Sequence, residues 1–286
     1  MNQPHPNNFC GCGFTDWLEV NLTPECNGKC TWCVERRGWH PKRFAPWREI
    51  ADAAIASGRK NIILLGGEPT LHPHLGNIIR YLRAYGLNPW LTTNGSLLTE
   101  QWVKDNLEGV EGVNISIHHY AFFMNKEITG VTLDRGILFG AIGQLHNMGA
   151  SVRFNCNCIR GYIDSEEEMH YYAEWAKEMG SDKVRFAELK YDTENFVDLA
   201  NTLSYAHGLN DNPYICGCSK GAVWDGMQVD FRQMCGLQTR RRPCPANPKI
   251  IPHPVLYYDG NIYDGWQQKK PSVPRTEPEG GGSCVY

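Results

Sequence analysis

Strand-like and helix-like patterns alternate six times between residues 16 and 190, which limits the folds open to this chain. The predicted strands are Asp16–Thr23, Asn61–Gly66, Asn88–Asn94, Gly112–His118, Ser151–Ile159 and Lys183–Leu189, and the predicted helices lie near 47–58, 71–86, 99–107, 132–149 and 165–180. This alternation favours parallel βαβ units with right-handed crossovers. Six units predict an α/β fold, a partial (β/α)6 TIM-like barrel with a small Cys-rich C-terminal extension.

Two of the predicted helices have a clear apolar face. The residues on these faces are Leu75, Ile78, Ile79 and Leu82 in the first helix, and Met169, Tyr172, Ala173 and Ala176 in the second. Each set follows the i, i+3, i+4, i+7 spacing of one side of an α-helix. We expect both faces to pack against the sheet.

The 286 residues suffice for one large α/β domain with a small appendage. We divide them into an N-terminal segment (1–15), the partial barrel (16–190), a Cys-rich extension (191–268) and a flexible tail (269–286), whose content of Pro, Gly and charged residues disfavours a packed structure. In the extension the sequence predicts a helix over Glu194–Ala206 and, from its Asp-Gly pair, a β-hairpin over Tyr257–Tyr263.

Charge and hydropathy exclude several classes of protein. The formal net charge of −3 gives no overall field that would recruit nucleic acid or an anionic membrane. The first eight residues have no apolar core of the kind an export signal needs, and no window approaches 18 uninterrupted apolar residues. We therefore expect a cytoplasmic protein without a membrane partner, and nucleic acid is disfavoured as a partner.

Twelve cysteines indicate metal or cluster binding, because a chain of this size needs no disulfide framework. Cys26, Cys30 and Cys33 follow the first predicted strand with the spacing C-x3-C-x2-C. A [4Fe–4S] cluster is normally held by four thiolates, so three ligands leave one iron open for chemistry. A structural zinc knuckle is the alternative, but it lacks an obvious fourth ligand at short spacing.

This cysteine spacing, Trp32 before the last cysteine, and Gly66-Gly67-Glu68-Pro69 after the second strand together resemble the radical S-adenosylmethionine (radical SAM) superfamily. The resemblance covers roughly residues 16 to 190. It implies that the open iron binds the amine and carboxylate of S-adenosylmethionine. One electron, from a donor such as flavodoxin or ferredoxin, then cleaves the C–S bond to give methionine and a 5′-deoxyadenosyl radical.

The resemblance also assigns residues to the cofactor. Trp32 would lie beside the adenine, the Gly66-Gly67 stretch would bind the amino group of the methionine moiety, and Glu68 would supply negative charge nearby. Neither glycine has a Cβ, so their backbone can approach a bound molecule closely. Without the cysteines, a plain βα turn would explain the same stretch.

Further cofactor contacts are implied on the third to fifth strands. Thr93 and Asn94, in the stretch Thr92-Thr93-Asn94-Gly95, would lie beside the cofactor, while Ser116 and Asn155 would contact the ribose. His118, at the end of the fourth strand, is a candidate catalytic residue that contacts substrate or donates a proton. The alternative for His118 is a surface or capping histidine.

The fifth predicted strand alternates polar and apolar residues. Arg153, Asn155 and Asn157 share one face, and Val152, Phe154, Cys156 and Cys158 share the other. We expect the polar face to line the barrel lumen, where Arg153 could meet the cofactor carboxylate through a bidentate contact. An edge strand with a wet outer face would give the same pattern.

Four cysteines of the extension form a separate group. Cys216, Cys218, Cys235 and Cys244 could hold a second [4Fe–4S] cluster or a structural zinc ion, or they could remain free thiols. Cys10 and Cys12 could replace one of these pairs. Spacing alone does not decide between the metals.

The leading functional hypothesis is a radical SAM enzyme that abstracts a hydrogen atom from a peptide or a small polar metabolite. One alternative is an iron–sulfur electron-transfer or metal-binding protein without radical chemistry. Another is an activating enzyme that places a glycyl radical on a partner protein.

Overall fold

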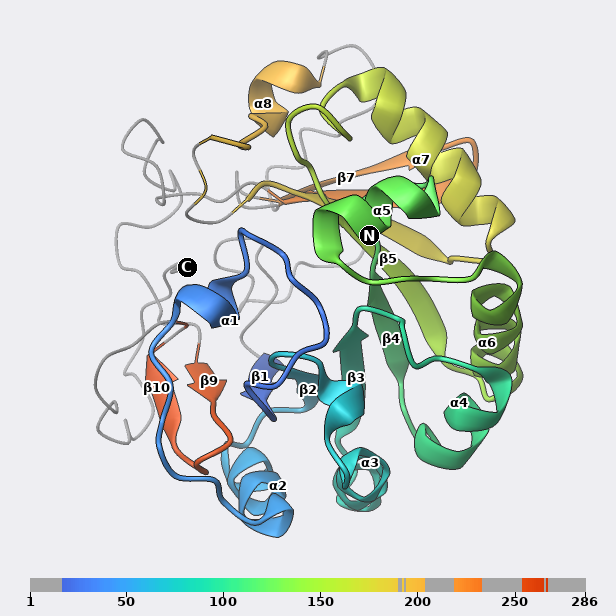
Figure 1. Cartoon of the computed structure of the whole chain (residues 1–286). Helices are drawn as coiled ribbons and strands as arrows, with labels where there is room; N and C mark the ends of the chain where they lie inside the picture. Colours follow the sequence, from blue (N-terminus) through green and yellow to red (C-terminus); the bar gives the residue numbers. More distant parts are fainter. Residues whose placement is uncertain are drawn as a thin grey trace, which may run out of the picture.

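The computed structural model describes residues 17–189, 192, 194–203, 219–232, 254–264 and 266. Its strands are β1 (Trp17–Asn21), β2 (Asn61–Leu65), β3 (Asn88–Thr93), β4 (Gly112–Ser116), β5 (Ser151–Asn157), β6 (Lys183–Ala187), β7 (Ser219–Trp224), β8 (Met227–Arg232), β9 (Pro254–Leu256) and β10 (Ile262–Asp264). Within these ranges they form one sheet in the order β10-β9-β1-β2-β3-β4-β5-β6-β8-β7 (Figure 1).

The first six strands are parallel and lie in chain order, which confirms the predicted open α/β barrel. All six strands that the sequence predicts are present, each one to three residues shorter than expected. Because the strands are parallel, their carboxyl ends meet at one edge of the sheet. The loops at that edge include both the cysteine stretch and the Gly-Gly-Glu-Pro stretch.

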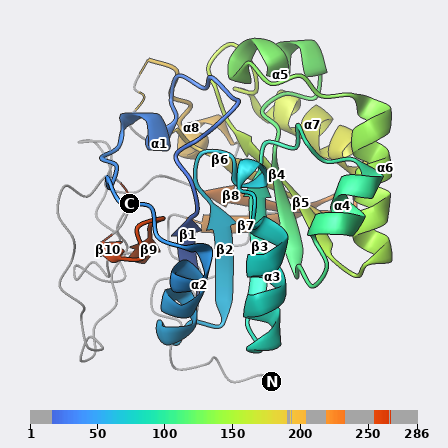
Figure 2. The ribbon, with the colours of Figure 1, turned by 60° about the horizontal axis from the view of Figure 1, so that its bottom comes forward.

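The helices are α1 (Val34–Arg37), α2 (Trp47–Ala56), α3 (Leu75–Ala84), α4 (Glu100–Asn106), α5 (Phe122–Thr129), α6 (Arg135–Asn147), α7 (Glu166–Glu178) and α8 (Leu199–Thr202). Helices α2, α3, α4, α6 and α7 lie along the outside of the curved sheet (Figures 1 and 2). Side chains of Thr99, Asp134 and Ser165 cap the first turns of α4, α6 and α7, as their residue types favour. None of the helices in the described ranges is long and apolar enough to cross a bilayer.

The core lies between the sheet and these outer helices. Strand residues that face the helices are fully or almost fully buried, among them Leu18, Val20, Ile62, Leu64, Leu91, Val113, Ile115, Val152, Phe154, Val184, Phe186, Val229 and Phe231. The two apolar helix faces that the sequence predicts are buried too. Removing this apolar surface from water is the main stabilising contribution to the fold.

The structure differs from the predictions in several helices, including the short α1, which was not predicted. Helix α3 begins at Leu75 rather than near 71, because a 3-10 turn over Pro69–Leu71 comes first. Helix α5 was not predicted, since its apolar residues do not follow a strong helical period. The helix expected over Glu194–Ala206 is present only as α8 within the described part of that range, where the chain first forms a bridge from Phe196 to Ile159.

Two hairpins of the predicted C-terminal extension widen the barrel sheet. The first consists of β7 and β8 around Asp225-Gly226, and β8 pairs in parallel with β6. The second consists of β9 and β10 around Asp259-Gly260, which confirms the predicted hairpin, and β9 pairs in parallel with β1. The extension therefore contributes strands to both edges of the predicted barrel.

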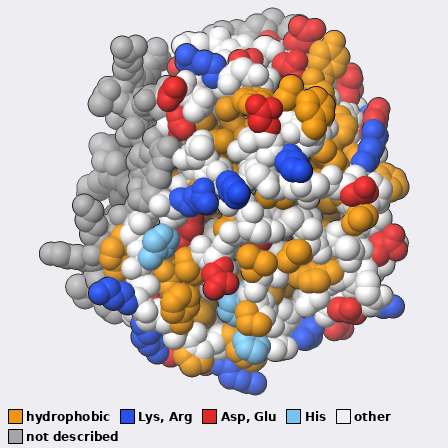
Figure 3. All heavy atoms as spheres, viewed as in Figure 1, with side chains coloured by type: hydrophobic (Ala, Val, Ile, Leu, Met, Phe, Trp, Pro, Cys, Tyr) orange, Lys and Arg blue, Asp and Glu red, His pale blue; other side chains and the backbone are white. Residues whose placement is uncertain are grey.

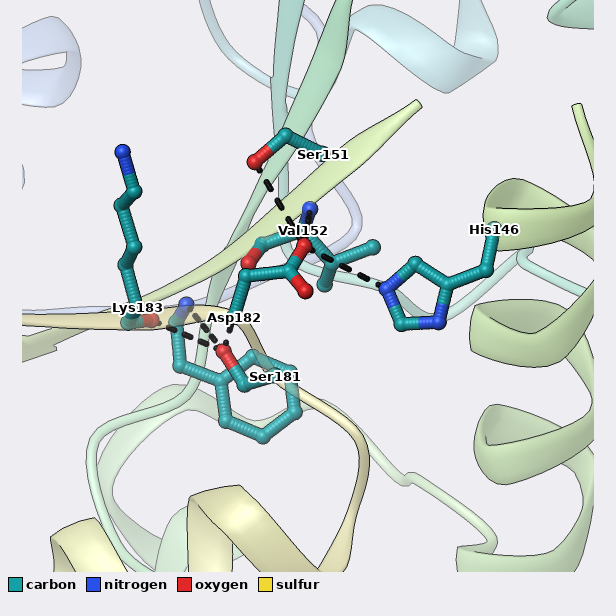
Figure 4. A network of polar contacts seen from close by, with 7 residues as sticks. His146, Ser151, Val152, Ser181, Asp182 and Lys183 are labelled. Carbon is teal, nitrogen blue, oxygen red and sulfur yellow. Dashed lines mark hydrogen bonds and ion pairs between the residues drawn. The ribbon is translucent and has the colours of Figure 1, made fainter. Parts of the chain in front are cut away.

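A polar network secures the amino ends of β5 and β6, opposite the functional edge (Figure 4). Asp182 accepts a hydrogen bond of 2.7 Å from the Val152 amide and lies 3.3 Å from His146 Nε2. The Ser181 hydroxyl donates to the Lys183 carbonyl and accepts from the Phe154 amide. This end of the barrel thus has a stabilising role, as is usual for barrels of this type.

The surface seen in Figure 3 interleaves acidic and basic side chains over its described part. This agrees with the nearly balanced formal charge of the chain.

Candidate active site

The cysteine loop, residues 22–33, leaves the carboxyl end of β1. Cys26 is exposed, Cys30 and Cys33 are half-buried, and none of the three is in a disulfide. The Cys26 sulfur accepts a hydrogen bond of 3.2 Å from the Gly28 amide, which curls the loop around it. All three thiols are thus available as ligands from one short loop.

The electrostatics of these thiols favour a bound cation. Burial raises the pKa of Cys26, and burial together with Cys33 and Cys26 raises the pKa of Cys30 to about 12. Thiolates, the form that binds metals, would therefore be unfavourable here without a positive centre beside them. The donor set fits an iron–sulfur cluster, whose irons supply that positive charge.

A zinc site would need a tighter arrangement of ligands. Tetrahedral zinc with Zn–S bonds of about 2.3 Å holds its sulfurs about 3.8 Å apart. Within the described ranges, no three Cys, His or acidic side chains form a group that could hold one metal ion. In a [4Fe–4S] cluster each thiolate binds a different iron, so the sulfurs lie farther apart. Three thiols on one loop match a cluster in which one iron has no protein ligand.

Gly66 and Gly67 pack directly against the start of the cysteine loop. The Gly67 amide donates to the Thr23 carbonyl at 2.6 Å, and the Glu68 amide donates to the Glu25 carbonyl at 2.7 Å. A Cβ on Gly66 would lie 2.6 Å from the Thr23 carbonyl oxygen, and one on Gly67 would meet the backbone of Pro24 and Glu25. The close approach of the cysteine loop thus requires both glycines. Their contact with the cofactor stays a prediction.

Glu68 is a buried acceptor that joins the ends of β2 and β3. Its carboxylate accepts hydrogen bonds from the Thr70 amide (3.1 Å) and hydroxyl (2.6 Å), the Thr93 hydroxyl (2.6 Å) and the Asn94 amide (2.7 Å). Burial raises the pKa of Glu68, and the four hydrogen bonds oppose that shift. The carboxylate therefore holds the loop after β2 and the loop after β3 together.

Asn94 connects the β3 loop to the cysteine loop. Its side-chain amide donates to Asn27 Oδ1 at 2.7 Å, and the Asn27 amide donates to the Ser96 hydroxyl at 2.8 Å. On the other side, the Lys29 amide donates to the Thr129 carbonyl at the end of α5. The cysteine loop is thus held from both β3 and α5, which reduces the ordering needed when a cluster binds.

His118 is buried beside Trp32. The two rings pack edge-to-face with centroids 5.5 Å apart, and His118 Nδ1 accepts a hydrogen bond of 3.0 Å from the Asn157 amide. Burial lowers the pKa of His118 to about 4, so the imidazole is neutral near pH 7. These contacts favour a positioning role, in which His118 fixes Trp32, over proton donation.

The polar face of β5 lines the concave side of the sheet, as predicted. Val152, Phe154 and Cys156 are buried, while Arg153, Asn155 and Asn157 are half-buried. Arg153 Nε donates to Asn155 Oδ1 at 3.0 Å, and Asn155 lies opposite Ser116 of β4 in the sheet register. The residues assigned to the ribose are thus neighbours.

Sequence reasoning missed the charged residues that continue this face onto β6 and β8. Arg185 lies next to Asn155 in the register, and its Nη2 is 3.2 Å from Asp230 Oδ2. Arg232 follows Asp230 by two residues and so points to the same face. These residues could have been assigned to the concave face from the sequence, because charged and apolar residues alternate in Lys183-Val-Arg185-Phe and in Asp230-Phe-Arg232.

The other predicted metal ligands lie outside the described residues. These are Cys216, Cys218, Cys235 and Cys244, together with the possible replacements Cys10 and Cys12. Cys156 and Cys158 are free, fully buried thiols in the core, as expected for packed cysteines.

Comparison with known proteins adds sequence relatives and similar folds. Residues 20–176 match the family described as the Radical SAM superfamily. The GTP 3′,8-cyclase of Aliarcobacter butzleri is 29% identical over 208 residues, which are 69% of this chain and 60% of that protein. A probable GTP 3′,8-cyclase of Thermococcus kodakarensis is 32% identical over 157 residues, 52% of this chain and 50% of that protein. This chain thus spans half to three fifths of the length of these relatives.

Among solved structures, Streptococcus suis SuiB superposes with a TM-score of 0.56 at 17% identity, covering 87% of this chain and 60% of SuiB. SuiB bound to S-adenosylmethionine gives a TM-score of 0.53 at 20% identity over 66% of this chain and 42% of SuiB. At these identities the likeness establishes the fold alone.

Proposed function

Because the chain belongs to the radical SAM superfamily, we propose that it abstracts a hydrogen atom from a small polar metabolite or a peptide. It is an enzyme, and the superfamily uses a [4Fe–4S] cluster and S-adenosylmethionine. When bound, these groups supply a one-electron C–S cleavage, whose product, a 5′-deoxyadenosyl radical, takes the hydrogen atom. A small one-electron donor such as flavodoxin or ferredoxin would supply the electron for that cleavage.

The observation that carries this proposal is the convergence of three loops at the carboxyl edge of the sheet. The cysteine loop, the Gly-Gly-Glu-Pro stretch and the Thr-Thr-Asn-Gly stretch are joined through Glu68 and Asn94. Cys26, Cys30 and Cys33 would hold the cluster from this fixed edge. Pre-organisation of this kind keeps reacting groups aligned without an ordering cost at each turnover.

The residues near this edge would bind and orient S-adenosylmethionine. We assign Trp32 to the adenine and Arg153 to the carboxylate. The ribose would be contacted by Ser116 and Asn155. The side of the methionine moiety would be lined by Gly66, Gly67, Glu68, Thr93 and Asn94. Arg153 suits that assignment because its guanidinium is half-buried and reaches toward Asn155. Its donor fork matches a carboxylate in two parallel hydrogen bonds.

Of the two substrate classes, we favour the small polar metabolite. The sequence relatives described above are named for a nucleotide, GTP, and the match to them extends beyond the cysteine stretch. SuiB, which has been solved with a precursor peptide, is related to this chain in fold alone. The polar concave face formed by β4, β5 and β6 also suits a hydrogen-bonding small molecule.

The Cys30→Ala substitution tests the proposed function. We expect it to abolish both the cluster absorbance and the formation of 5′-deoxyadenosine, whereas Cys158→Ala, which removes a core thiol, should retain both. Retention of both properties by Cys30→Ala would disprove the proposal. A wild-type cluster whose spectrum is unchanged by S-adenosylmethionine, with no 5′-deoxyadenosine formed, would indicate an electron-transfer protein instead.

The C-terminal cysteines would bind a second cluster in the same proposal. Iron analysis separates the possibilities when wild type is compared with a variant in which Cys26, Cys30 and Cys33 are all alanine. About eight irons falling to about four would place a second [4Fe–4S] cluster among the remaining cysteines, Cys216, Cys218, Cys235 and Cys244 foremost. About four falling to none would leave these residues as zinc ligands or free thiols.

A further inference from the structure

The short helix α1 determines where Cys33 lies. Cys33 is the N-cap residue of this four-residue helix, and its side chain makes no capping hydrogen bond. Isolated helices shorter than about 12–15 residues are only marginally stable in water, so α1 cannot hold its own conformation. The position of Cys33 therefore depends on contacts that fix α1 from outside.

A buried carboxylate supplies one such contact. Glu35 of α1 is 5% exposed, and its Oε2 accepts a hydrogen bond of 2.9 Å from Asn21 Nδ2. Asn21 is the last residue of β1 and is completely buried. The two residues are 14 positions apart, so this hydrogen bond connects the strand that enters the cysteine loop to the helix that leaves it (Figure 1).

The other oxygen of the same carboxylate faces the segment that follows α1. His40 Nδ1 lies 3.2 Å from Glu35 Oε1, without the alignment of a hydrogen bond. The next residue, Pro41, accepts a hydrogen bond of 3.2 Å from the Tyr258 hydroxyl, in the turn after β9. A carboxyl group buried in this way costs free energy unless it is hydrogen-bonded. The partner that Asn21 provides is thus needed for α1 to pack where it does.

We propose that Glu35 is a positioning residue, which fixes Cys33 relative to the other two cysteines by connecting α1 to the end of β1. The proposal rests on the proposed function for the identity of these cysteines as cluster ligands. The bonds to β3 and α5 described above reach Asn27 and Lys29, in the first half of the loop, whereas the bond of Glu35 acts on α1. Residues that orient metal ligands in this way typically contribute about 10–100-fold to metal affinity.

Iodoacetamide labelling of the full-length protein, read for each cysteine by mass spectrometry, tests this inference. In anaerobically reconstituted wild type, a bound cluster should protect Cys33 from labelling. After addition of an iron chelator, Glu35→Ala should lose this protection at least about ten-fold faster than wild type. In the cluster-free protein under reductant, the same substitution should raise the labelling rate of Cys33 more than that of Cys26, which is already exposed.

Further variants separate the hydrogen bond from charge and from general stability. Glu35→Gln removes the charge but keeps an oxygen that can accept from Asn21, so it should protect Cys33 as wild type does. Asn21→Asp replaces the donor by a second carboxylate and should lose protection, and the double variant Asn21→Asp/Glu35→Gln, which exchanges donor and acceptor, should restore it. Ser181→Ala, which removes a buried hydroxyl at the opposite end of the barrel, should leave Cys33 protected.

Several results would overturn the inference. One is wild-type labelling of Cys33 in Glu35→Ala in both states of the protein. Another is an equal loss of protection in Glu35→Gln, which would assign the effect to charge, or in Ser181→Ala, which would assign it to stability. Failure of the double variant to restore protection would also exclude the hydrogen bond as the cause.

Failure of the proposed function would be recognised separately. In that case Cys26, Cys30 and Cys33 of reconstituted wild type would all be labelled as fast as in the cluster-free protein. The labelling of cluster-free Glu35→Ala would still show whether Glu35 positions Cys33, because that measurement needs no bound cluster.

Discussion

At the scale of single residues, burial decides what a titratable group does at this site. His118 is fully enclosed, accepts a backbone hydrogen bond at Nδ1 and packs against Trp32. Glu68 is equally enclosed but is surrounded by four donors. Both side chains thus position neighbouring groups, because their polar atoms are already engaged within the protein.

The lowered pKa of His118 predicts a pH-dependent stability. Its pKa is about 4 in the folded protein against 6.5 ordinarily, so the unfolded state binds more protons between these values. Stability must therefore fall as the pH drops through this window, and His118 alone should cost about 2 kcal/mol between pH 7 and pH 5. Urea titration of the cluster-free protein under reductant, at both pH values, measures this change.

The matched variant is His118→Asn, which retains an acceptor near the Nδ1 position but cannot titrate. Its free energy of unfolding should depend less on pH than that of wild type by that same amount. His72, whose pKa is also lowered to about 4, is present in both proteins and cancels in the comparison. Equal pH dependence in the two proteins would contradict this assignment.

At the scale of elements, the cysteine loop is a part of the barrel edge rather than an appended loop. Its backbone bonds to the Gly-Gly-Glu stretch after β2, and its side chains bond to the loop after β3. The close approach of two backbones is possible because residues 66 and 67 lack a Cβ. The three cysteines that we propose as cluster ligands are thereby held in a fixed position relative to the sheet.

The Gly67→Ala substitution should displace this loop. The added methyl would overlap the backbone of Pro24 and Glu25, which cannot rotate away as a side chain can. We expect a loss of about 1–3 kcal/mol in stability and of most of the iron retained after reconstitution. Iron analysis and urea denaturation measure both effects.

Gly143→Ala is the control for this substitution. Gly143 lies in α6, where an added Cβ would meet no atom within 4 Å. Alanine there should raise stability by about 0.5–1 kcal/mol, through the higher helix propensity, and leave the iron content unchanged. A Gly67→Ala protein with wild-type iron and stability would refute the proposed packing role.

At the scale of the whole molecule, both edges of the barrel sheet depend on segments from the last third of the chain. β8 covers β6 and β9 covers β1, so neither predicted edge strand is left open at those positions. The second hairpin also buries a set of large side chains, namely Val255, Leu256, Tyr257, Tyr258 and Tyr263. Edge coverage and burial together make this hairpin part of the barrel core.

Two truncations test this dependence. Removal of residues 254–286 deletes five buried side chains, each contributing about 1.5–3 kcal/mol, which is comparable to the total stability of about 5–15 kcal/mol of a typical protein. The shortened protein should lose its cooperative unfolding transition and its iron. A chain ending at residue 268 removes only the predicted tail and should keep both. If both shortened proteins kept the unfolding transition and the iron, the core role of the hairpin would be contradicted. If both lost them, the predicted tail would be contradicted.

The strands, most of the helices and the location of the cysteine loop could be predicted because each depends on a local, periodic pattern. The alternation of Val152 and Phe154 with Arg153 and Asn155 was sufficient to assign the two faces of β5. Helix α5 could not be predicted because its apolar residues do not follow a strong helical period. Part of its support comes instead from a segment a hundred residues away, where the Lys29 amide donates to the Thr129 carbonyl.

The sequence by itself determined the open α/β barrel and the position of the cysteine loop that we propose as the cluster site, since spacing and period are properties of neighbouring residues. Only the tertiary structure placed the cysteine loop in the space left by Gly66 and Gly67, and Arg185 beside Asp230. Those contacts depend on which strands pair, and β8 joins β6 only after the chain has passed through β7. Pairing of this kind is decided by burial and hydrogen bonding across the whole sheet, which no local pattern encodes.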